Sequence, residues 1–314
     1  MTDAAYRILL AHLLEALKTP PAQETRRLFH GRGKCWPGLE QITVDWLSGV
    51  VLVMLFREPE GDIEALLREL IASDTFAASG ARGLLLQQRY LPGAPSHWLY
   101  GEAPSPWHIQ EHGLTYLLDL GGKQNSGLFL DMRLGRQWVR EHTAGKRVLN
   151  LFAYTCGFSV AAIAGGASTV VNLDMARAAL SRGRDNHRAN DHDLARVEFL
   201  GHELFKSWGR VKRSGPYDLV IIDPPSFQKG SFVLTQDYRK VLRRLPELLN
   251  PGAQVLACVN DPEIGPEFLL EAMGDEAPQL VFVERLANPP EFPDIDPSSG
   301  LKALLFTLQG QSGN

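Results

Sequence analysis

Asp174 ends a short apolar run, and its distance from an earlier loop indicates a nucleotide site. The run Val170–Leu173 is typical of a buried strand, and Asp174 follows it directly. In doubly wound sheets, an acid about 20 residues after the first strand-to-helix turn accepts hydrogen bonds from ribose hydroxyls. We therefore expect Asp174 to hold a ribose, with Met175 beside it. The alternative role for Asp174 is to cap the helix that follows.

The loop Phe152–Gly157, with sequence Phe-Ala-Tyr-Thr-Cys-Gly, limits which nucleotide fits. Loops that bind dinucleotides carry three glycines, so that the backbone can approach a pyrophosphate. This loop has one glycine and two aromatic residues, and it suits a ligand with a ribose and a charged amino-acid tail. S-adenosylmethionine is such a ligand. We expect Gly157 to permit the tight turn, and Phe152 and Thr155 to flank the methionine tail.

A second chemical signal is Asp223–Phe227, with sequence Asp-Pro-Pro-Ser-Phe, which follows an apolar run. Pro224 and Pro225 fix φ at about −65° and lack N–H groups, so nearby carbonyl groups stay free to accept from an amine or a base edge. The ring of Phe227 can stack on a base turned out of its helix. The segment is thus predicted to bind the methyl acceptor, and a rigid strand exit is the alternative.

Three segments resemble the motifs of one enzyme family. Gly127–Arg133 (GLFLDMR), Asn150–Thr155 (NLFAYT) and Asp223–Phe227 (DPPSF) are similar to class I methyltransferases that modify bacterial large-subunit ribosomal RNA at cytosine carbon 5 or guanine N7. The segments occur in the family's order, and the resemblance extends over about residues 26–308. It implies S-adenosylmethionine as the cofactor and ribosomal RNA as the partner and substrate.

The resemblance also implies further cofactor contacts, among them Asn150 and Asp223. Phe129, Asp131 and Arg133 are expected to close the cofactor pocket, although Phe129 is equally consistent with a core position. Glu203 follows the third predicted strand and is expected to face the adenine amino group. His202 takes this place if the alignment shifts by one residue, and Glu203 is then a surface acid.

The cysteines separate two chemistries. Attack at cytosine carbon 5 requires a thiolate that adds to carbon 6 of the base. The family's carbon-5 members carry this cysteine after the fifth strand, where the present chain has Asn260, and Cys258 lies inside the predicted strand. The guanine N7 relatives carry asparagine in this loop. We therefore predict methylation of a base nitrogen, with guanine favoured and Asn260 catalytic, over carbon-5 chemistry through Cys258 or Cys156.

Strands and helices alternate from Lys146 onward, which is typical of a doubly wound α/β sheet. The resemblance implies a class I methyltransferase fold whose last strand is antiparallel. Strands are predicted at 148–152, 170–173, 197–200, 219–223, 254–259, 280–283 and 303–305, and helices at 132–140, 158–164, 175–190 and 238–249. We expect residues 121–314 to form this domain.

The preceding chain is predicted to form an amphipathic helix within residues 1–25 and a small α+β domain over 26–120, a possible approach surface for RNA. Leucines recur at helical spacing before Pro20, and Ser48-Gly49 separates two apolar runs as in a hairpin.

Composition bounds the remaining possibilities. The chain has 314 residues, of which 44% are hydrophobic and 22% charged, and its net charge is −4. Three cysteines without metal-ligand spacing indicate neither a disulfide framework nor a zinc site. A basic leader and a run of 18 apolar residues are both absent, so we expect a cytoplasmic protein without metal or membrane contact. The oligomeric state stays open.

Basic residues gather after Asp174 and after the proline motif. They could follow RNA phosphates, or they could be solvated helix faces. The residues are Arg177, Arg182, Arg184, Arg188, Lys206, Arg210, Lys212, Arg213, Lys229, Arg239, Lys240, Arg243 and Arg244. Besides the RNA methyltransferase, two hypotheses stay open: a methyltransferase for non-RNA amines, and an RNA-binding protein that has lost catalysis.

Overall fold

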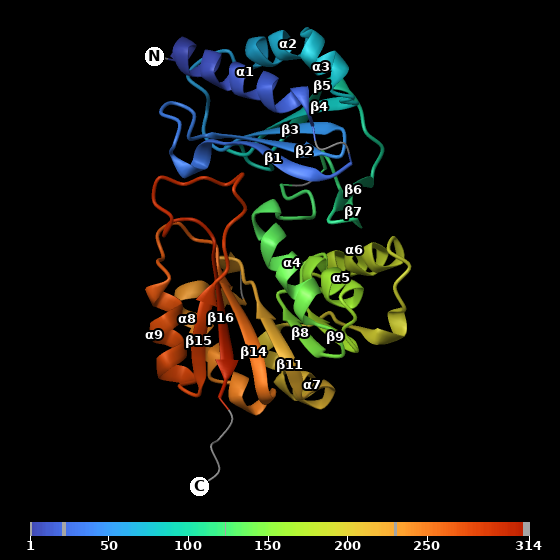
Figure 1. Cartoon of the computed structure of the whole chain (residues 1–314), viewed down its shortest axis with the longest axis vertical. Helices are drawn as coiled ribbons and strands as arrows, with labels where there is room; N and C mark the ends of the chain where they lie inside the picture. The colour runs from blue at the N-terminus through green and yellow to red at the C-terminus, as the bar shows by residue number, and fades with distance from the viewer. Residues whose placement is uncertain (1, 21–22, 123, 229–230, 310–314) are drawn as a thin grey trace. The chain divides into compact units, whose positions relative to one another are not determined.

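A computed structural model of the chain describes residues 2–20, 23–122, 124–228 and 231–309. The chain forms two compact units (Figure 1). The first consists of Met1–Leu130 with Pro289–Pro297, and the second of Asp131–Asn288 with Ser298–Asn314. Residues 121–130, which the sequence analysis assigned to the second domain, therefore cluster with the first unit. Within the described residues, no helix combines the length and the apolar character needed to cross a membrane.

The first unit is a five-stranded sheet covered on one face by helices. The sheet order is β1-β2-β3-β4-β5, and the predicted hairpin at Ser48-Gly49 is confirmed because β2 pairs antiparallel with β3. Leu9 and Leu13 of the first helix are completely buried against the sheet. The elements are α1 (Thr2–Lys18), β1 (Thr25–His30), β2 (Ile42–Leu47), β3 (Val50–Leu55), α2 (Ile63–Ile71), α3 (Asp74–Ala78), β4 (Gly83–Gln88), β5 (Ser96–Gly101), β6 (Trp107–Glu111) and β7 (Leu114–Leu118).

The segment Pro289–Pro297 belongs to the first unit although it lies late in the chain. The Ile295 N–H donates to the Gly33 carbonyl at 2.8 Å, and Arg26 forms an ion pair with Glu291 at 3.2 Å. A Cβ atom at Gly33 would lie only 1.8 Å from the carbonyl oxygen of Pro293. Glycine is therefore required at position 33 for this close approach.

The second unit is a seven-stranded sheet in the order β10-β9-β8-β11-β14-β16-β15. The predicted antiparallel last strand is confirmed, because β16 runs antiparallel to both β14 and β15 while the other neighbours are parallel. The strands are β8 (Arg147–Leu151), β9 (Thr169–Leu173), β10 (Val197–Leu200), β11 (Tyr217–Ile222), β14 (Leu249–Val259), β15 (Leu280–Arg285) and β16 (Lys302–Leu308).

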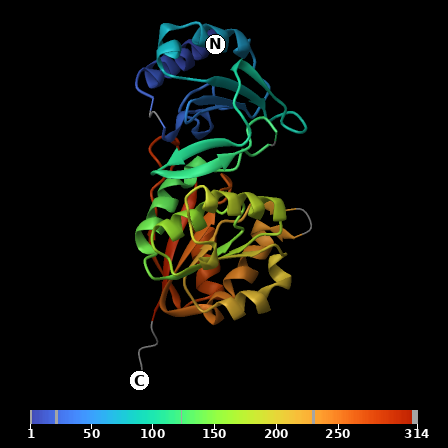
Figure 2. The ribbon, with the colours of Figure 1, turned by 90° about the vertical axis from the view of Figure 1, so that its right-hand side faces the viewer.

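Helices cover both faces of this sheet, as the doubly wound fold requires. Apolar residues of α4 (Arg133–His142) and α5 (Gly157–Ala164) pack on one face, and α5 also contacts α6 (Arg177–Arg188) (Figures 1 and 2). Residues of α7 (Trp208–Ser214), α8 (Leu234–Leu242) and α9 (Glu267–Glu276) pack on the other face. The predicted α/β fold class is thus confirmed.

Helices α8 and α9 depart from the prediction. The helix predicted over 238–249 covers Leu234–Leu242 instead, and Leu249 already begins β14. Pro246 lies in the intervening 3-10 turn and cannot donate the hydrogen bond that would continue an α-helix. The helix Glu267–Glu276 was not predicted, because Leu269, Ala272 and Met273 are its only buried apolar residues.

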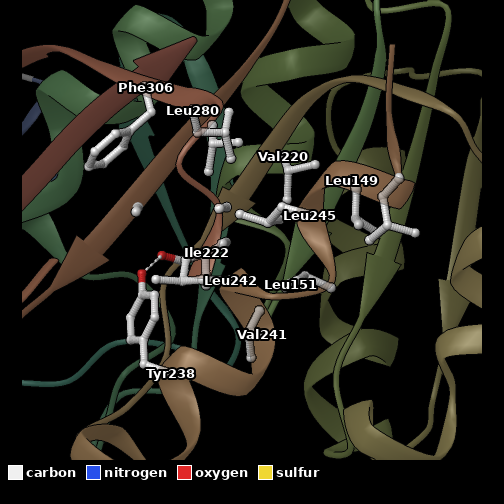
Figure 3. Close-up of a cluster of buried hydrophobic side chains, with 14 of the residues drawn as sticks. Leu149, Leu151, Val220, Ile222, Tyr238, Val241, Leu242, Leu245, Leu280 and Phe306 are labelled. Atoms are coloured by element: carbon white, nitrogen blue, oxygen red, sulfur yellow. Dashed lines mark hydrogen bonds between the residues drawn. The ribbon is translucent and has the colours of Figure 1, made fainter. Parts of the chain in front are cut away.

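The central core lies between β8, β11, β14 and helix α8 (Figure 3). Tyr238 of α8 is completely buried there, and its hydroxyl group lies 3.3 Å from the Ile222 carbonyl oxygen and 3.2 Å from that of Cys258. Ile222 and Cys258 lie at the carboxyl ends of β11 and β14. This hydroxyl can donate to either carbonyl, so it links the two strand ends that precede Asp223 and Asn260.

Candidate functional site

The loop after β8 turns through three residues in the left-handed region. Phe152, Tyr154 and Cys156 have φ values of 57°, 47° and 63°. Gly157, which was predicted to make the turn, is the first residue of α5 and has no positive φ. Left-handed backbone costs a non-glycine residue about 1–3 kcal/mol, and it persists where surrounding contacts fix it, often at functional sites.

Asp174 makes one of the contacts that fix this loop. One carboxylate oxygen, Oδ2, accepts from the Tyr154 N–H at 2.8 Å, and the other, Oδ1, accepts from the Ala176 N–H at 2.7 Å. The second bond is of the capping kind, because Ala176 directly precedes α6. Burial raises the pKa of Asp174, and the two hydrogen bonds oppose this shift. Each oxygen keeps a further lone pair that can accept from a ligand hydroxyl.

A pocket opens beside Asp174, and the space of about 250 Å³ within it includes open solvent. It brings together Phe152, Asp174, Met175 and Glu203, four of the residues that the sequence analysis selected, and also His202. Its lining residues are Phe152, Leu173, Asp174, Met175, His202, Glu203, Leu204, Phe205, Gln228 and Ser231.

Glu203 and His202 are both engaged at the wall of this pocket. Glu203 Oε1 accepts from the Phe205 N–H at 2.7 Å, and the carboxylate lies 3.6 Å from the Lys206 ammonium. The His202 ring hydrogen-bonds with Arg210. These two contacts fix the orientation of the Glu203 carboxylate. Because Glu203 lines the pocket, an amine of a ligand can reach it there.

A second polar cluster joins Asp131, Asp223 and Asn260. Asn260 Nδ2 donates to Asp131 Oδ2 at 2.7 Å, while Asp131 Oδ1 is buried without a hydrogen-bond partner. Burial and the nearby Asp131 charge raise the pKa of Asp223 to about 7, and Arg136 opposes the shift. Two strand ends and the 3-10 turn Leu130–Met132 thus contribute two carboxyl groups and one amide.

The donor set of this cluster fits a cationic group. A buried acceptor without a partner is costly, so the free oxygen of Asp131 favours a ligand that donates a hydrogen bond. The raised pKa of Asp223 also favours a cationic ligand, since a positive charge near the two carboxyl groups would lower this pKa again. An α-ammonium group of an amino-acid tail meets both requirements.

The other predicted residues are not in the lining of the pocket beside Asp174. Asn150 is buried and donates to Asn172 Oδ1 at 2.9 Å, inside the sheet. Thr155 and Arg133 are also buried, with 5% and 7% exposure. Phe129 is 45% exposed and clusters with the first unit.

The proline motif leads from β11 into a short hairpin of β12 (Phe227–Gln228) and β13 (Phe232–Val233). Pro224 is buried, whereas Pro225 is exposed. The Phe227 side chain is 65% exposed, which is unusual for an aromatic ring unless a partner covers it. Gln228 at its end lines the pocket beside Asp174.

The two cysteines of the second unit are completely buried. Cys258 lies in β14, which is paired on both sides by β11 and β16. Burial raises the thiol pKa of both Cys258 and Cys156, and nearby carboxyl groups add to the shift. Neither thiol therefore forms the thiolate that a nucleophile requires.

Most of the basic residues after the proline motif are paired with acids. Arg239 contacts Asp275 at 2.6 Å and Arg243 contacts Glu276 at 2.7 Å. Further pairs are Lys240 with Asp237, Arg244 with Glu247, Lys212 with Glu247, and Arg188 with Asp185. Lys229 lies outside the described residues. These pairs are those of a solvated helix surface.

Sequence reasoning missed how closely α6 approaches the loop. A Cβ atom at Gly183 would lie 2.3 Å from Cys156 Sγ, so glycine is required there. A single glycine between Arg182 and Arg184, inside a basic helix, was the available signal. In the part of the chain that the structure describes, no three His, Cys, Asp or Glu side chains are placed to hold a metal ion.

Comparisons with known proteins agree with this geometry. The ribosomal RNA large subunit methyltransferase I of Aeromonas salmonicida is 36% identical, covering 50% of this chain and 41% of that protein. The enzyme of the same name from Erwinia tasmaniensis is 32% identical, covering 62% and 52%. The chain spans about half the length of these curated relatives.

A solved structure extends the likeness to nearly the whole chain. SMU.776, a candidate methyltransferase complexed with SAH, superposes with a TM-score of 0.81 at 26% identity, covering 98% of this chain and 81% of that one. The model of the S-adenosylmethionine-dependent methyltransferases matches residues 26–307. The chain belongs to this family, whose cofactor and enzyme class are those that the sequence analysis predicted.

Proposed function

We propose that the chain methylates a base nitrogen, with guanine favoured, in large-subunit ribosomal RNA. The RNA substrate is supported by the names of the relatives from Aeromonas salmonicida and Erwinia tasmaniensis, which the chain matches over about half their length. The choice of nitrogen is carried by one observation of this chain: both cysteines of the second unit are completely buried, which raises the pKa of their thiols.

The two polar clusters divide the cofactor between them. Asp174 accepts from the ribose hydroxyls through the lone pairs that its backbone bonds leave, and Glu203 accepts from the adenine amine. Asp131 and Asp223 receive the ammonium group of the amino-acid tail. Phe152 lines the pocket beside Asp174, at the start of the strained loop.

S-adenosylmethionine supplies a methyl group on a positively charged sulfur, whose leaving group is neutral. The protein therefore contributes mainly alignment, and acid or base help is minor. The exposed ring of Phe227 stacks on the acceptor base, beside a proline motif whose two prolines have no N–H group to donate. Asn260 donates its amide N–H to Asp131, so its amide oxygen can accept from an amine on the base edge.

Cytosine carbon-5 methylation fits the site poorly. It needs a thiolate that bonds to the base, and Cys258 is enclosed in the middle of the sheet while Cys156 is packed against Gly183. The exposed side chain at the end of β14 is Asn260. This position offers an amide for hydrogen bonding and no nucleophile.

The test is tritiated methyl transfer into bulk RNA from a strain that lacks the protein, followed by nucleoside analysis. We expect label in ribosomal RNA on a guanine nitrogen. Label on cytosine carbon 5 would overturn the choice of nitrogen. Label in protein or small amines, with none in RNA, would favour the non-RNA amine methyltransferase. RNA binding without transfer, while the cofactor still binds, would favour the inactive protein.

A further inference from the structure

Lys302 is a completely buried lysine at the first position of β16. Its ammonium group donates to the Asp261 carbonyl at 2.6 Å and lies 3.5 Å from the Ser299 carbonyl. Removing an ammonium group from water carries a large desolvation cost, so fully buried lysines are rare. A methionine of similar length would fill this position without that cost.

The position of Lys302 connects it to the second polar cluster. Lys302 pairs with Val259, the last residue of β14, and the next residue of the chain is Asn260. The carbonyl that Lys302 holds, that of Asp261, is therefore joined directly to Asn260. Asn260 in turn donates to Asp131 Oδ2 at 2.7 Å, which leaves Oδ1 as the free buried acceptor.

We propose that Lys302 is a positioning residue, which fixes the loop after β14 so that Asn260 and Asp131 keep their mutual orientation. The lysine acts through the backbone of Asp261, to whose carbonyl its ammonium group donates. Carbonyl groups on two loops are held by one ammonium group, so the loop after β14 is tied to the turn before β16. This inference rests on the proposed role of Asn260 in methyl transfer.

The test is a double-mutant cycle of Lys302→Met with Asn260→Ala, in the full chain. We expect each single variant to lower kcat about 10- to 100-fold, because small displacements of aligned groups have effects of this size. If Lys302 acts through Asn260, the double variant loses no more than Asn260→Ala alone. Each variant is assayed below its own melting temperature.

A second readout is independent of turnover. Hydrogen exchange of residues 260–264 should become faster in Lys302→Met and stay unchanged in the matched control Lys146→Met. Lys146 is a partly buried lysine that donates to Gln254 Oε1 at 2.9 Å, and it directly precedes β8, at the opposite end of the strands. Lys146→Met should therefore keep the wild-type kcat.

The outcomes separate the two proposals. Losses that multiply in the double variant, or wild-type kcat and exchange in Lys302→Met, would overturn the positioning role. A wild-type kcat in Asn260→Ala would instead overturn the role proposed for Asn260. If Lys302→Met does not fold, Lys302→Gln takes its place in the cycle, because its amide can still donate to one of the two carbonyl groups.

Discussion

The two polar clusters of the second unit are built in different ways. The cluster around Asp174 is local, because the loop 152–156, the strand β9 and the start of α6 belong to the consecutive elements β8, α5, β9 and α6. The cluster of Asp131, Asp223 and Asn260 joins residues from three distant segments, and 129 positions separate its hydrogen-bonded pair. The first is held by backbone hydrogen bonds, and the second by contacts between side chains.

This difference has an energetic counterpart. The local cluster concentrates left-handed backbone at Phe152, Tyr154 and Cys156, which its hydrogen bonds compensate. The distant cluster instead keeps a buried acceptor on Asp131 without a partner and a carboxyl group with a raised pKa on Asp223. We infer that the first cluster is formed before a ligand arrives, whereas the second gains most from the ligand's charge.

The largest expected effect tests the local cluster. Asp174→Ala should weaken binding of S-adenosylhomocysteine by about 1.5–3 kcal/mol, because charged hydrogen bonds to the ribose are lost. Isothermal calorimetry measures this affinity. The control is Asp185→Ala, an acid on α6 whose partner is the surface residue Arg188. Unchanged affinity in a folded Asp174→Ala variant would remove Asp174 from the site.

A smaller effect tests the distant cluster through pH. The pKa of Asp223 is raised to about 7, so its carboxyl is protonated at pH 6 and ionised at pH 8. If the ionised form is required, kcat/KM of the wild type should be about tenfold lower at pH 6 than at its plateau. Asp223→Asn should lose this pH dependence. A titration near pH 7 that persists in the variant would assign it to another group.

The same pKa has a consequence for stability. The folded-state pKa lies above the ordinary aspartate value of 3.8, so ionisation of Asp223 destabilises the native protein increasingly from about pH 4 to about pH 7. At pH 8 this destabilisation is complete. Asp223→Asn should therefore raise the melting temperature at pH 8 more than at pH 4, and thermal melts at the two pH values measure the difference.

The next prediction concerns the strand that leads to Asn260. Cys258→Ala should keep most methyltransferase activity and lower the free energy of unfolding by about 1 kcal/mol, because only a small buried group is removed. Urea unfolding and initial rates measure the two quantities. The contradicting results are a complete loss of methylation with native-like melting, or covalent trapping of RNA that contains 5-fluorocytosine.

The smallest expected effect concerns two arginines of α8 that belong to neither cluster, and it is measured as the salt dependence of RNA binding. Reversing Arg239 and Arg243 to glutamate should leave the salt dependence of ribosomal RNA binding unchanged, because both side chains are already paired with acids of α9. The comparison is with reversal of Arg184 of α6, which lies over the Phe199 ring and should lower the slope if α6 follows phosphates. A slope lowered by reversal of Arg239 and Arg243 would assign phosphate contacts to α8.

The local cluster could be predicted from the sequence better than the distant one. Asp174 could be placed because strand, loop and acid are close in the sequence and the βαβ geometry is general. The role of Gly157 was predicted wrongly, since sterically disfavoured conformations at Phe152, Tyr154 and Cys156 depend on contacts from Asp174 and β9. Local propensity contains no such information.

The distant cluster was predicted only as separate residues. The motifs selected Asp131, Asp223 and Asn260, but their arrangement depends on the register of β11, β14 and β16, which sequence patterns leave undefined. Lys302 had no signal at all, because a lysine before an apolar strand is ordinarily exposed. The strand order followed from the fold class, and the element bounds depended on tertiary packing.

The segment Pro289–Pro297 has a consequence for how this protein can be recombined. The backbone passes between the two units after Leu130, after Asn288 and after Pro297, so neither unit is one continuous stretch of the gene. A chimera made by a single crossover near residue 130 would combine Gly33 and Arg26 from one parent with Pro293 and Glu291 from the other. Exchange between relatives should therefore succeed only when both pieces of the first unit are inherited together.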